Sequence, residues 1–297
     1  MPGKILVSGS SGLIGAALLP VLRSSGYAVT RLVRGASGEG RIGWDPARPL
    51  SPESVSSFDA VVNLAGESIV GRWTEATKRR IRESRVQGTR NLATALAAAV
   101  QRPRVLVSAS AIGYYGDRGE ETLREDSSSG EGFLPYVCRE WEEAAGPAAK
   151  AGIRVVQVRF GVVLSRSGGA LQAMLFPFRM GVGGKMGSGR QWMSWIDIDD
   201  VAGAIQHVLQ SDTLRGPVNV VAPNPVRNVE FTKTLASVLS RPAIFPMPAF
   251  AAHLVFGQMA DELLLASQRV EPAKLLGSGY AFQKPGLKAA LETILKR

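Results

Sequence analysis

The sequence lacks several features that are typical of particular classes of protein. Cys138 is the single cysteine among 297 residues, so no internal disulfide is possible and a reducing compartment is expected. No apolar run approaches the ~18 residues that a membrane span needs, and no signal peptide is expected before the first strand. The two histidines, His207 and His253, lie far apart in sequence, so no metal site or histidine-based catalytic cluster is predicted. We expect a cytoplasmic globular protein with no membrane partner.

The charge is strongly of one sign, with a formal net value of +10. Such an excess of positive charge can bind nucleic acid, a membrane surface or a small anionic ligand. The basic residues are densest between Lys78 and Arg90, on a helix expected to start near Thr74, with Glu75 and Glu83 among them. No aromatic stacking platform of the kind that single-strand binders use is interleaved with them. We interpret the stretch as a solvated helix face, with an anionic substrate or partner as the alternative, and expect no nucleic-acid partner.

Short apolar runs alternate with helical patterns as far as residue 164, and residues 197–221 complete the series. Runs that are apolar throughout indicate strands buried on both faces of a parallel sheet, joined by right-handed helical crossovers. The predicted fold class is α/β, a Rossmann-type doubly wound parallel sheet. The expected strands are 4–8, 27–33, 58–64, 104–109, 153–160 and 218–221, and the expected helices are 12–25, 74–100, 136–151 and 197–210.

This alternation breaks after residue 164. Residues 168–195 are rich in glycine, methionine and aromatics, and the chain after Pro223 is mostly helical with proline punctuation. We therefore predict two units. A Rossmann domain spans 1–164 and is completed by 197–221, and a smaller, mostly helical substrate or cap lobe spans 165–196 and 222–297.

The strongest motif is the pattern Gly9-x-x-Gly12-x-x-Gly15, which follows the first expected strand and opens the first expected helix. A tight turn needs a residue that is free to take positive φ. A pyrophosphate needs bare backbone N–H groups and the positive end of a helix dipole. No Gly-Lys-Ser/Thr follows, which excludes a nucleotide-triphosphate loop. The motif predicts a dinucleotide site, against the alternative of an incidental glycine turn.

The end of the second expected strand indicates which dinucleotide binds. An NAD site usually places an Asp or Glu there to take the ribose 2′-hydroxyl, and the stretch Val29–Gly35 contains neither. It offers Arg34, whose guanidinium suits a 2′-phosphate. We predict NADP (NADPH) as the cofactor, with an ordinary surface arginine as the alternative.

Further segments carry a resemblance to a known family. Three of them are Asn63–Ile69, Ser108–Gly116 and Ser194–Ala202. Together they resemble the extended short-chain dehydrogenase/reductases, the group that holds the nucleotide-sugar epimerases and dehydratases. Four shorter stretches narrow the resemblance to the bacterial "epimerase family protein" subgroup; they are Arg72–Thr74, Ser84–Thr89, Cys138–Glu142 and Gly183–Gly189. That subgroup also has a C-terminal helical segment, which Pro246–Arg297 matches.

The resemblance implies a set of cofactor-binding positions. The residues implied to hold the pyrophosphate are Gly9, Ser11, Gly12, Leu13, Ile14 and Gly15. Leu64, Ala65 and Gly66 are implied to pass beside the adenosine ribose, and Ser108 to lie near the nicotinamide. Trp44 is expected to border the adenine, with simple packing as the alternative.

The broad class also implies catalytic residues. A Ser or Thr hydrogen-bonds the substrate oxygen, a Tyr moves a proton, and a Lys four residues later on the same helix face lowers the pKa of that Tyr. Ser110 matches the first role and Tyr136 the second. Glu140 stands where the lysine is expected, and no lysine occurs between Arg79 and Ala149.

Three readings of the missing lysine stay open. Arg139 supplies the positive charge; or Glu140 or Glu67 acts as the acid/base while Tyr136 only packs; or the site does no redox chemistry. Cys138 is expected in the core of its helix rather than as a nucleophile. Arg85 stands where many extended members keep an asparagine, so a role for that asparagine is not carried over.

The sequence defines the substrate-binding residues less well than the cofactor-binding residues. Residues 181–195 have the composition of a mobile cap, with a packed irregular connection as the alternative. The expected substrate residues are Glu67, Tyr114, Trp192 and Trp195. The function predicted is that of an NADP-dependent oxidoreductase or epimerase acting on a small polar or anionic, nucleotide-sugar-like substrate. The alternative is a catalytically weak NADP-binding sensor or regulatory protein linked to cell division, and a homodimer is one expectation for the assembly.

Overall fold

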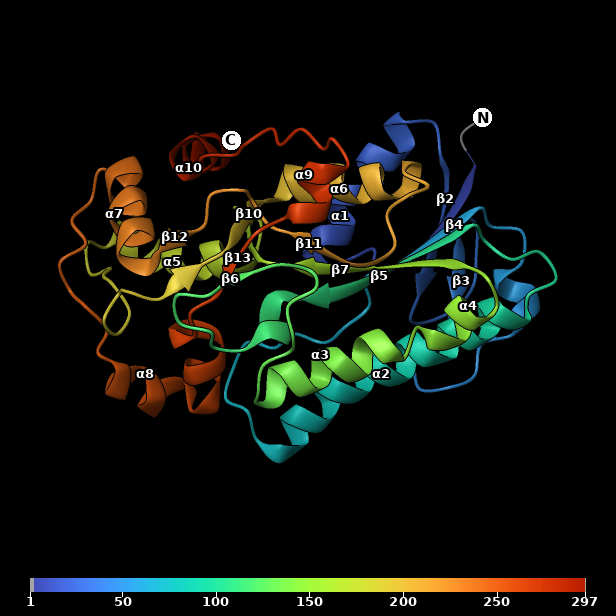
Figure 1. Ribbon diagram of the computed structural model, residues 1–297, viewed down its shortest axis with the longest axis horizontal. Helices are drawn as coiled ribbons and strands as arrows, with labels where there is room; N and C mark the ends of the chain where they lie inside the picture. Colours follow the sequence, from blue (N-terminus) through green and yellow to red (C-terminus); the bar gives the residue numbers. More distant parts are fainter. Residues whose placement is uncertain (1–2, 297) are drawn as a thin grey trace.

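A seven-stranded parallel sheet forms the centre of the computed structural model, which describes residues 3–296 (Figure 1). Its strands are β1 (Lys4–Ser8), β2 (Ala28–Val33), β3 (Arg41–Gly43), β4 (Ala60–Asn63), β5 (Val105–Ala111), β7 (Arg154–Phe160) and β11 (Gly216–Val220). They lie in the order β11-β7-β5-β4-β1-β2-β3. The chain moves from β1 outward to β3 and then returns to β4 on the other side of β1. Ligands of open α/β sheets bind at such a switch point, and the predicted α/β Rossmann-type fold is confirmed.

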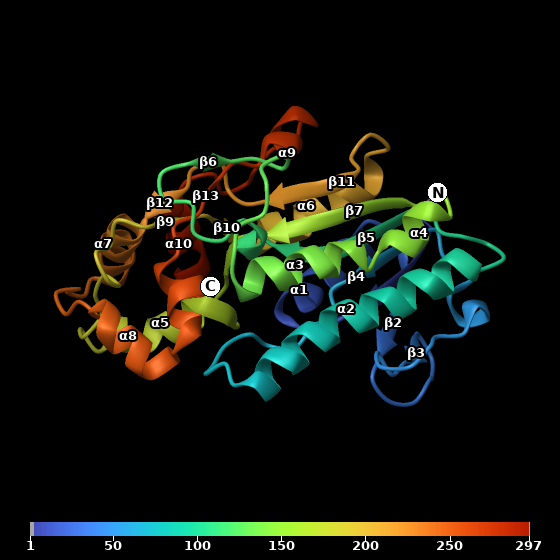
Figure 2. The same ribbon diagram turned by 60° about the horizontal axis from the view of Figure 1, so that its bottom comes forward.

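Helices cover both faces of this sheet (Figures 1 and 2). One face carries α1 (Leu13–Ser24) and α6 (Ile198–Gln210), and the other carries α2 (Glu75–Ala98), α3 (Phe133–Glu143) and α4 (Gly146–Lys150). The remaining short pieces of this part are the 3₁₀ turns η1 (Pro52–Val55) and η2 (Ile112–Tyr115) and the helix α9 (Ala273–Gly277).

Alternation along β1 supplies a core on each face of the sheet. Ile5 packs into the cluster that includes Leu18 and Leu22 of α1, and its neighbour Leu6 packs into the cluster that includes Leu92 and Leu96 of α2. All six side chains are fully buried, and burying a leucine or isoleucine contributes roughly 1.5–3 kcal/mol. The two clusters fix the carboxyl ends of the strands against α1 and α2.

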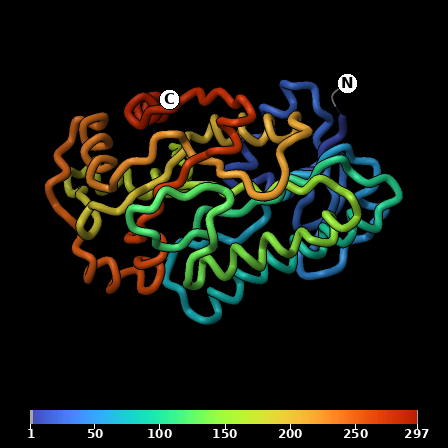
Figure 3. The backbone as a smooth tube through the Cα atoms, viewed as in Figure 1, coloured from blue at the N-terminus to red at the C-terminus, as the bar shows by residue number. Residues whose placement is uncertain are grey.

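The lobe lies beyond these carboxyl ends and is coloured mainly yellow to red in Figure 3, whereas the sheet is mainly blue to green. Its helices are α5 (Gly169–Arg179), α7 (Asn228–Leu239), α8 (Ala249–Phe256), the π-helical turn η3 (Ala260–Leu265) and α10 (Leu287–Lys296). Its short strands pair as β8 (Val162–Leu164) with β10 (Trp195–Asp197), β9 (Trp192–Met193) with β12 (Val226–Arg227), and β6 (Thr122–Leu123) with β13 (Arg269–Val270). The lobe has a buried cluster of its own, which includes Leu171, Trp195 and Phe231. The predicted domain boundaries at 164, 197 and 221 stay predictions.

The expected helix 136–151 is in fact two helices, and the first begins three residues earlier. Glu262 of the lobe accepts hydrogen bonds from the backbone N–H groups of Phe133 (3.1 Å) and Leu134 (2.7 Å), so a carboxylate caps the start of α3. Pro147, near the start of α4, cannot donate the backbone hydrogen bond that a continuous helix requires. The capping partner is more than a hundred residues away, so local sequence gives no sign of where α3 begins.

Within residues 3–296, no helix is long and apolar enough to cross a membrane. The same residues contain no group of three or more His, Cys, Asp or Glu side chains arranged to hold a metal ion.

Candidate functional site

The glycine turn after β1 is made of backbone in close contact. Gly9 has φ +65°, and a Cβ there would lie 2.5 Å from the carbonyl carbon of Leu64. A Cβ on Gly15 would lie 2.4 Å from the carbonyl oxygen of Gly9. The backbone N–H of Gly12 donates to that same oxygen at 3.0 Å. Positions 9 and 15 therefore admit glycine only, whereas Gly12 has room for a small side chain.

The amino end of α1 lies at this turn, beside the carboxyl ends of β1 and β4, and we call the region between these ends the crevice. Gly12 is the N-cap, no side chain caps the helix, and its first turn has no acidic residue. Ser11 and Gly12 are exposed, and Leu13 and Ile14 are half-buried. The side chain of Leu13 lies against Gly168 and Gly169, which lead into α5. Uncapped N–H groups beside bare backbone fit a pyrophosphate.

Arg34 follows directly after β2, the strand next to β1 in the sheet. Its side chain is exposed and forms no ion pair with any of residues 3–296. Close by, the indole N–H of Trp44 is buried and has no hydrogen-bond partner among the described residues. Because Trp44 packs against Gly88 of α2, its ring closes one side of this region.

The second wall of the crevice is the end of β4. The hydroxyl of Ser8 donates to Asn63 Oδ1 at 2.6 Å, and Asn63 Nδ2 donates to the hydroxyl of Thr89 at 2.9 Å. These bonds hold the segment Leu64–Gly66 against the glycine turn. On the neighbouring strand, the hydroxyl of Ser108 is buried without a hydrogen-bond partner among the described residues. An unsatisfied buried hydroxyl costs about 1–3 kcal/mol, and a bound cofactor would relieve that cost.

Ser110 lies at the end of β5 in a buried polar network. Its hydroxyl donates to Glu142 Oε1 at 2.7 Å. Arg159 of β7 donates to both oxygens of the same carboxylate, at 2.7 and 2.8 Å. Only 3% of the Arg159 side chain and 13% of the Glu142 side chain are exposed. Burial lowers the pKa of Arg159, but the hydrogen bonds and charge of Glu142 outweigh it and hold that pKa above its usual value. The pair is a fixed charge centre next to Ser110.

Two tyrosines complete this network. The guanidinium carbon of Arg159 lies 3.6 Å from the centre of the Tyr114 ring. Arg159 also donates to the hydroxyl of Tyr115 at 2.9 Å, and that hydroxyl donates to Asn219 Oδ1 at 2.8 Å. Burial raises the pKa of Tyr115 to about 12. Tyr114 is thus placed beside the charge centre, and Tyr115 stays protonated as a structural group.

Tyr136, predicted as the proton-transferring residue, lies at the surface and is bonded to Glu140 rather than to Ser110. The side chain is 43% exposed, and its hydroxyl donates to Glu140 Oε1 at 2.9 Å. Glu140 is paired with Arg82 of α2, which lowers the pKa of that carboxyl. Neither Tyr136 nor Glu140 contacts Ser110. Arg139 donates to Ser129 Oγ and the Gly130 carbonyl, so it does not replace the missing lysine either.

The phase of α3 explains this outcome. Leu134, Cys138 and Glu142 are spaced by four residues; the first two are buried and Glu142 is half-buried. A Cβ on Gly113, just after β5, would touch Leu134 and Cys138. Tyr136 and Glu140 are two residues off this face and point toward α2. The residues that α3 presents to the end of β5 are therefore a leucine, a thiol and a carboxylate. Burial, with the nearby charge of Glu142, raises the pKa of the Cys138 thiol to about 12.

Comparison with known proteins agrees with this architecture. The model of the "NAD dependent epimerase/dehydratase family" matches residues 5–221, and a domain of unknown function (DUF1731) matches residues 247–294. The chain belongs to the NAD dependent epimerase/dehydratase family. The predicted resemblance to the extended short-chain dehydrogenase/reductases is confirmed.

Similar proteins extend over the whole chain. An epimerase family protein of Mycobacterium tuberculosis (strain CDC 1551 / Oshkosh), MT2273, is 41% identical over 290 residues, which cover 97% of this chain and 96% of its own. The human epimerase family protein SDR39U1 is 40% identical over 296 residues, covering 98% and 99%. A crystal structure of the human protein (isoform 2) with NADPH has a TM-score of 0.91 at 39% identity and covers 99% of both chains.

Among the expected substrate residues, the structure separates two from the crevice. Trp195 is fully buried in the lobe core, and its indole donates to the Asn224 carbonyl, so it cannot contact a substrate without repacking. Glu67 is exposed and pairs with Arg80 at 3.0 Å. Tyr114, in contrast, lies at the charge centre described above.

Trp192 lies between two cations. The guanidinium carbons of Arg227 and Arg269 are 4.6 and 4.7 Å from its ring centre. Its indole donates to Glu120, which also accepts from Arg227. This arrangement holds the ring at the surface of the lobe, and a contact of Trp192 with substrate stays a prediction.

Sequence reasoning missed two charged residues of the site, Glu142 and Arg159, and gave no role to a third, Arg85. Arg85 packs against the Trp141 ring at 5.1 Å and donates to the carbonyls of Ile81 and Glu67. Burial lowers its pKa. The buried stripe of α3 was the signal for Glu142, because that stripe continues from Cys138 by four residues.

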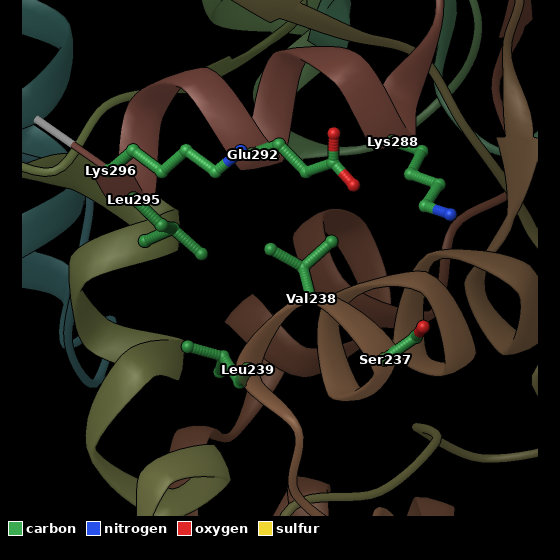
Figure 4. Close-up of a pocket in the computed structure, with 7 residues that line it drawn as sticks. All are labelled: Ser237, Val238, Leu239, Lys288, Glu292, Leu295 and Lys296. Atoms are coloured by element: carbon green, nitrogen blue, oxygen red, sulfur yellow. The ribbon is translucent and has the colours of Figure 1, made fainter.

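A surface hollow between α7 and α10 is shown in Figure 4. Lys288, Glu292 and Lys296 of α10 and Val238 of α7 line it. None of the predicted site residues lines this hollow, so it does not contribute to the crevice.

Proposed function

We propose that this member of the epimerase family binds NADPH in the crevice between β1 and β4. The observation that carries the proposal is the glycine turn itself, in which two missing Cβ atoms open the backbone beside an uncapped helix. Arg34, unpaired at the end of β2, suits the 2′-phosphate, and the unpartnered Ser108 hydroxyl suits the nicotinamide end. The human relative that resembles this chain throughout was crystallised with NADPH.

We propose further that the chain is an oxidoreductase or epimerase for a small polar, nucleotide-sugar-like substrate. NADPH supplies hydride chemistry when bound. Ser110 donates its proton to Glu142, so its oxygen is free to accept a hydrogen bond from a substrate hydroxyl. In the oxidising direction a proton can pass from the substrate hydroxyl through Ser110 to Glu142, and in the reducing direction, with NADPH bound, the proton passes from Glu142 through Ser110 to the substrate oxygen, while Arg159 balances the charge. Ser110 keeps its predicted role, and Glu142 takes the place predicted for Tyr136.

A second candidate function is favoured by the inward face of α3. Leu134 and Cys138 bring no ionisable group of suitable pKa to the end of β5. A protein with this face can bind the cofactor without turning it over. That arrangement fits an NADPH-binding sensor or regulatory protein linked to cell division.

Cofactor choice is tested by titrating the chain with NADPH and NADH and following the fluorescence of the reduced nicotinamide. A charge-assisted bond to the 2′-phosphate contributes about 1.5–3 kcal/mol, so NADPH is expected to bind about tenfold to a hundredfold more tightly. Arg34→Ala should remove this difference and leave NADH binding unchanged. Arg23→Ala, an exposed arginine at the other end of α1, is the control. Equal affinities of the native chain for both cofactors would contradict the assignment of Arg34.

Chemistry is tested by NADPH oxidation with aldehydes, ketones and sugar nucleotides. Once a substrate is found, Ser110→Ala should lower kcat about 10²-fold or more. Tyr136→Phe should stay within about twofold, because its hydroxyl contacts Glu140 at the surface. A larger loss of kcat in Tyr136→Phe than in Ser110→Ala would indicate that Tyr136 transfers the proton. Absence of turnover with every substrate would favour the sensor function.

We also propose that the protein is cytoplasmic and that it forms a homodimer. Light scattering of the purified chain with and without NADPH measures the assembly directly.

A further inference from the structure

Two helices of the lobe, α5 and α8, and the segment before α8 leave large apolar side chains in solvent. Six of them are 56–76% exposed: Phe176, Met180, Ile244, Phe245, Phe250 and Leu254. We call these six residues the apolar face. They make up six of the thirteen large hydrophobic side chains that are exposed among residues 3–296. The sequence of α8 is Ala-Phe-Ala-Ala-His-Leu-Val-Phe, and a helix that is apolar all round is normally buried.

The parts of the apolar face are held together by backbone and side-chain contacts. The backbone N–H of Phe245 donates to the Gly183 carbonyl at 3.3 Å, and that of Met247 donates to the Lys185 carbonyl at 2.9 Å. A Cβ on Gly181, which follows α5, would lie 3.5 Å from the side chain of Pro242, in the segment that leads to α8. Phe176 of α5 and its C-cap residue Met180 are spaced by four residues, as are Phe250 and Leu254 of α8, so each pair lies on one side of its helix.

Positive charge predominates around the apolar face, and the acidic residue that contacts α8 is Asp261 of η3, which pairs with His253 at 3.3 Å. No Asp or Glu occurs in residues 144–196 or 231–260, which supply all six of its members. Arg179 and Arg241 are exposed beside it, and Arg241 Nε donates to the Arg179 carbonyl at 3.1 Å. Neither arginine forms an ion pair with a residue in the range 3–296.

We propose that the apolar face docks on the surface of an anionic lipid bilayer. Its apolar side chains enter the boundary between headgroups and acyl chains, and Arg179 and Arg241 meet the lipid phosphates. The sequence predicts no membrane partner because no run is long enough to span, but attachment to one leaflet needs no span. Exposed arginines beside an apolar surface are the combination that binds anionic lipid, and this favours lipid as the occupant.

The test is flotation of the full chain with vesicles of phosphatidylcholine, with or without phosphatidylglycerol. The chain should float with the phosphatidylglycerol vesicles at low salt and much less with phosphatidylcholine alone. Phe250→Ser with Leu254→Ser should lower the bound fraction at least about tenfold. Arg179→Gln with Arg241→Gln should lower the partition coefficient about 25-fold on anionic vesicles only, since each arginine near such a surface contributes about fivefold.

Val100→Ser is the matched control. Val100 is 95% exposed and follows the end of α2, and its replacement should leave flotation unchanged. All variants should keep the unfolding midpoint of the native chain, because the altered side chains are exposed. Absence of flotation with anionic vesicles, or flotation of the Phe250/Leu254 variant at the native level, would overturn the proposal. Light scattering without vesicles gives a further contrary outcome: a native dimer that this variant converts to monomer would show that a second copy covers the face.

Discussion

The two ends of the crevice are built by different means. At the pyrophosphate end the contacts belong to backbone, and their positions follow from the spacing of Gly9, Gly12 and Gly15 along the chain. At the chemical end, side chains from β5, α3 and β7 meet at Ser110, Glu142 and Arg159. The first end is fixed by local conformation, whereas the second depends on the rotation of α3, which a carboxylate of the distant lobe helps to set. A binding site made of backbone groups can therefore be predicted from the sequence. A site made of side chains from packed helices is much harder to predict.

The largest effect is expected where backbone contact is closest. Gly15→Val places a branched side chain 2.4 Å from the Gly9 carbonyl oxygen, which should destroy the turn and abolish NADPH binding. Gly12→Ala is the matched variant, because a Cβ there meets only the Gly9 carbonyl oxygen, at 3.3 Å. It should fold and lose less than about 1 kcal/mol of unfolding free energy. Circular dichroism and denaturant unfolding distinguish the two variants. Equal losses of unfolding free energy in both would contradict the claim that close backbone contact fixes the pyrophosphate end.

The charge centre should show the next largest effect. Glu142→Gln leaves the Arg159 guanidinium buried without a counter-charge, which should lower the free energy of unfolding by about 3–5 kcal/mol. Glu271→Gln breaks an ion pair whose two side chains are 37% and 61% exposed and should cost no more than about 1 kcal/mol. Urea denaturation of both variants gives the comparison. A small loss for Glu142→Gln would mean that the chemical end is not held by this pair.

The smallest expected effect is the contribution of Cys138 to the pH dependence of the unfolding free energy. The thiol has a pKa of about 12 in the folded chain and about 8.5 when unfolded. The unfolded state therefore loses its proton first as pH rises, so the stability from this group is complete below about pH 8.5 and is lost above it. Between pH 9 and 10 the free energy of unfolding should fall by about 1 kcal/mol more in the native chain than in Cys138→Ala. Identical falls in the two chains would place the thiol in contact with solvent.

The sequence predicted the sheet, the glycine turn and Arg34 because each depends on neighbours along the chain. It placed Ser110 at the end of its strand for the same reason. The catalytic role of Tyr136 stays a prediction that its contacts do not favour: a motif of spacing four occurs on every face of a helix, and the buried stripe of α3 with the cap from Glu262 turns another face inward. The substrate role of Trp195 also stays a prediction, because an aromatic in a loop-rich stretch is typical both of a pocket wall and of the core of a lobe.

The most direct test is a crystal structure of the chain soaked with NADPH. The account predicts the pyrophosphate on the backbone of residues 11–15, the Arg34 guanidinium on the 2′-phosphate, and the Tyr136 hydroxyl still bonded to Glu140, away from the nicotinamide. A crevice that stays closed by protein atoms while the dinucleotide binds elsewhere, or a Tyr136 hydroxyl turned against the nicotinamide, would contradict it.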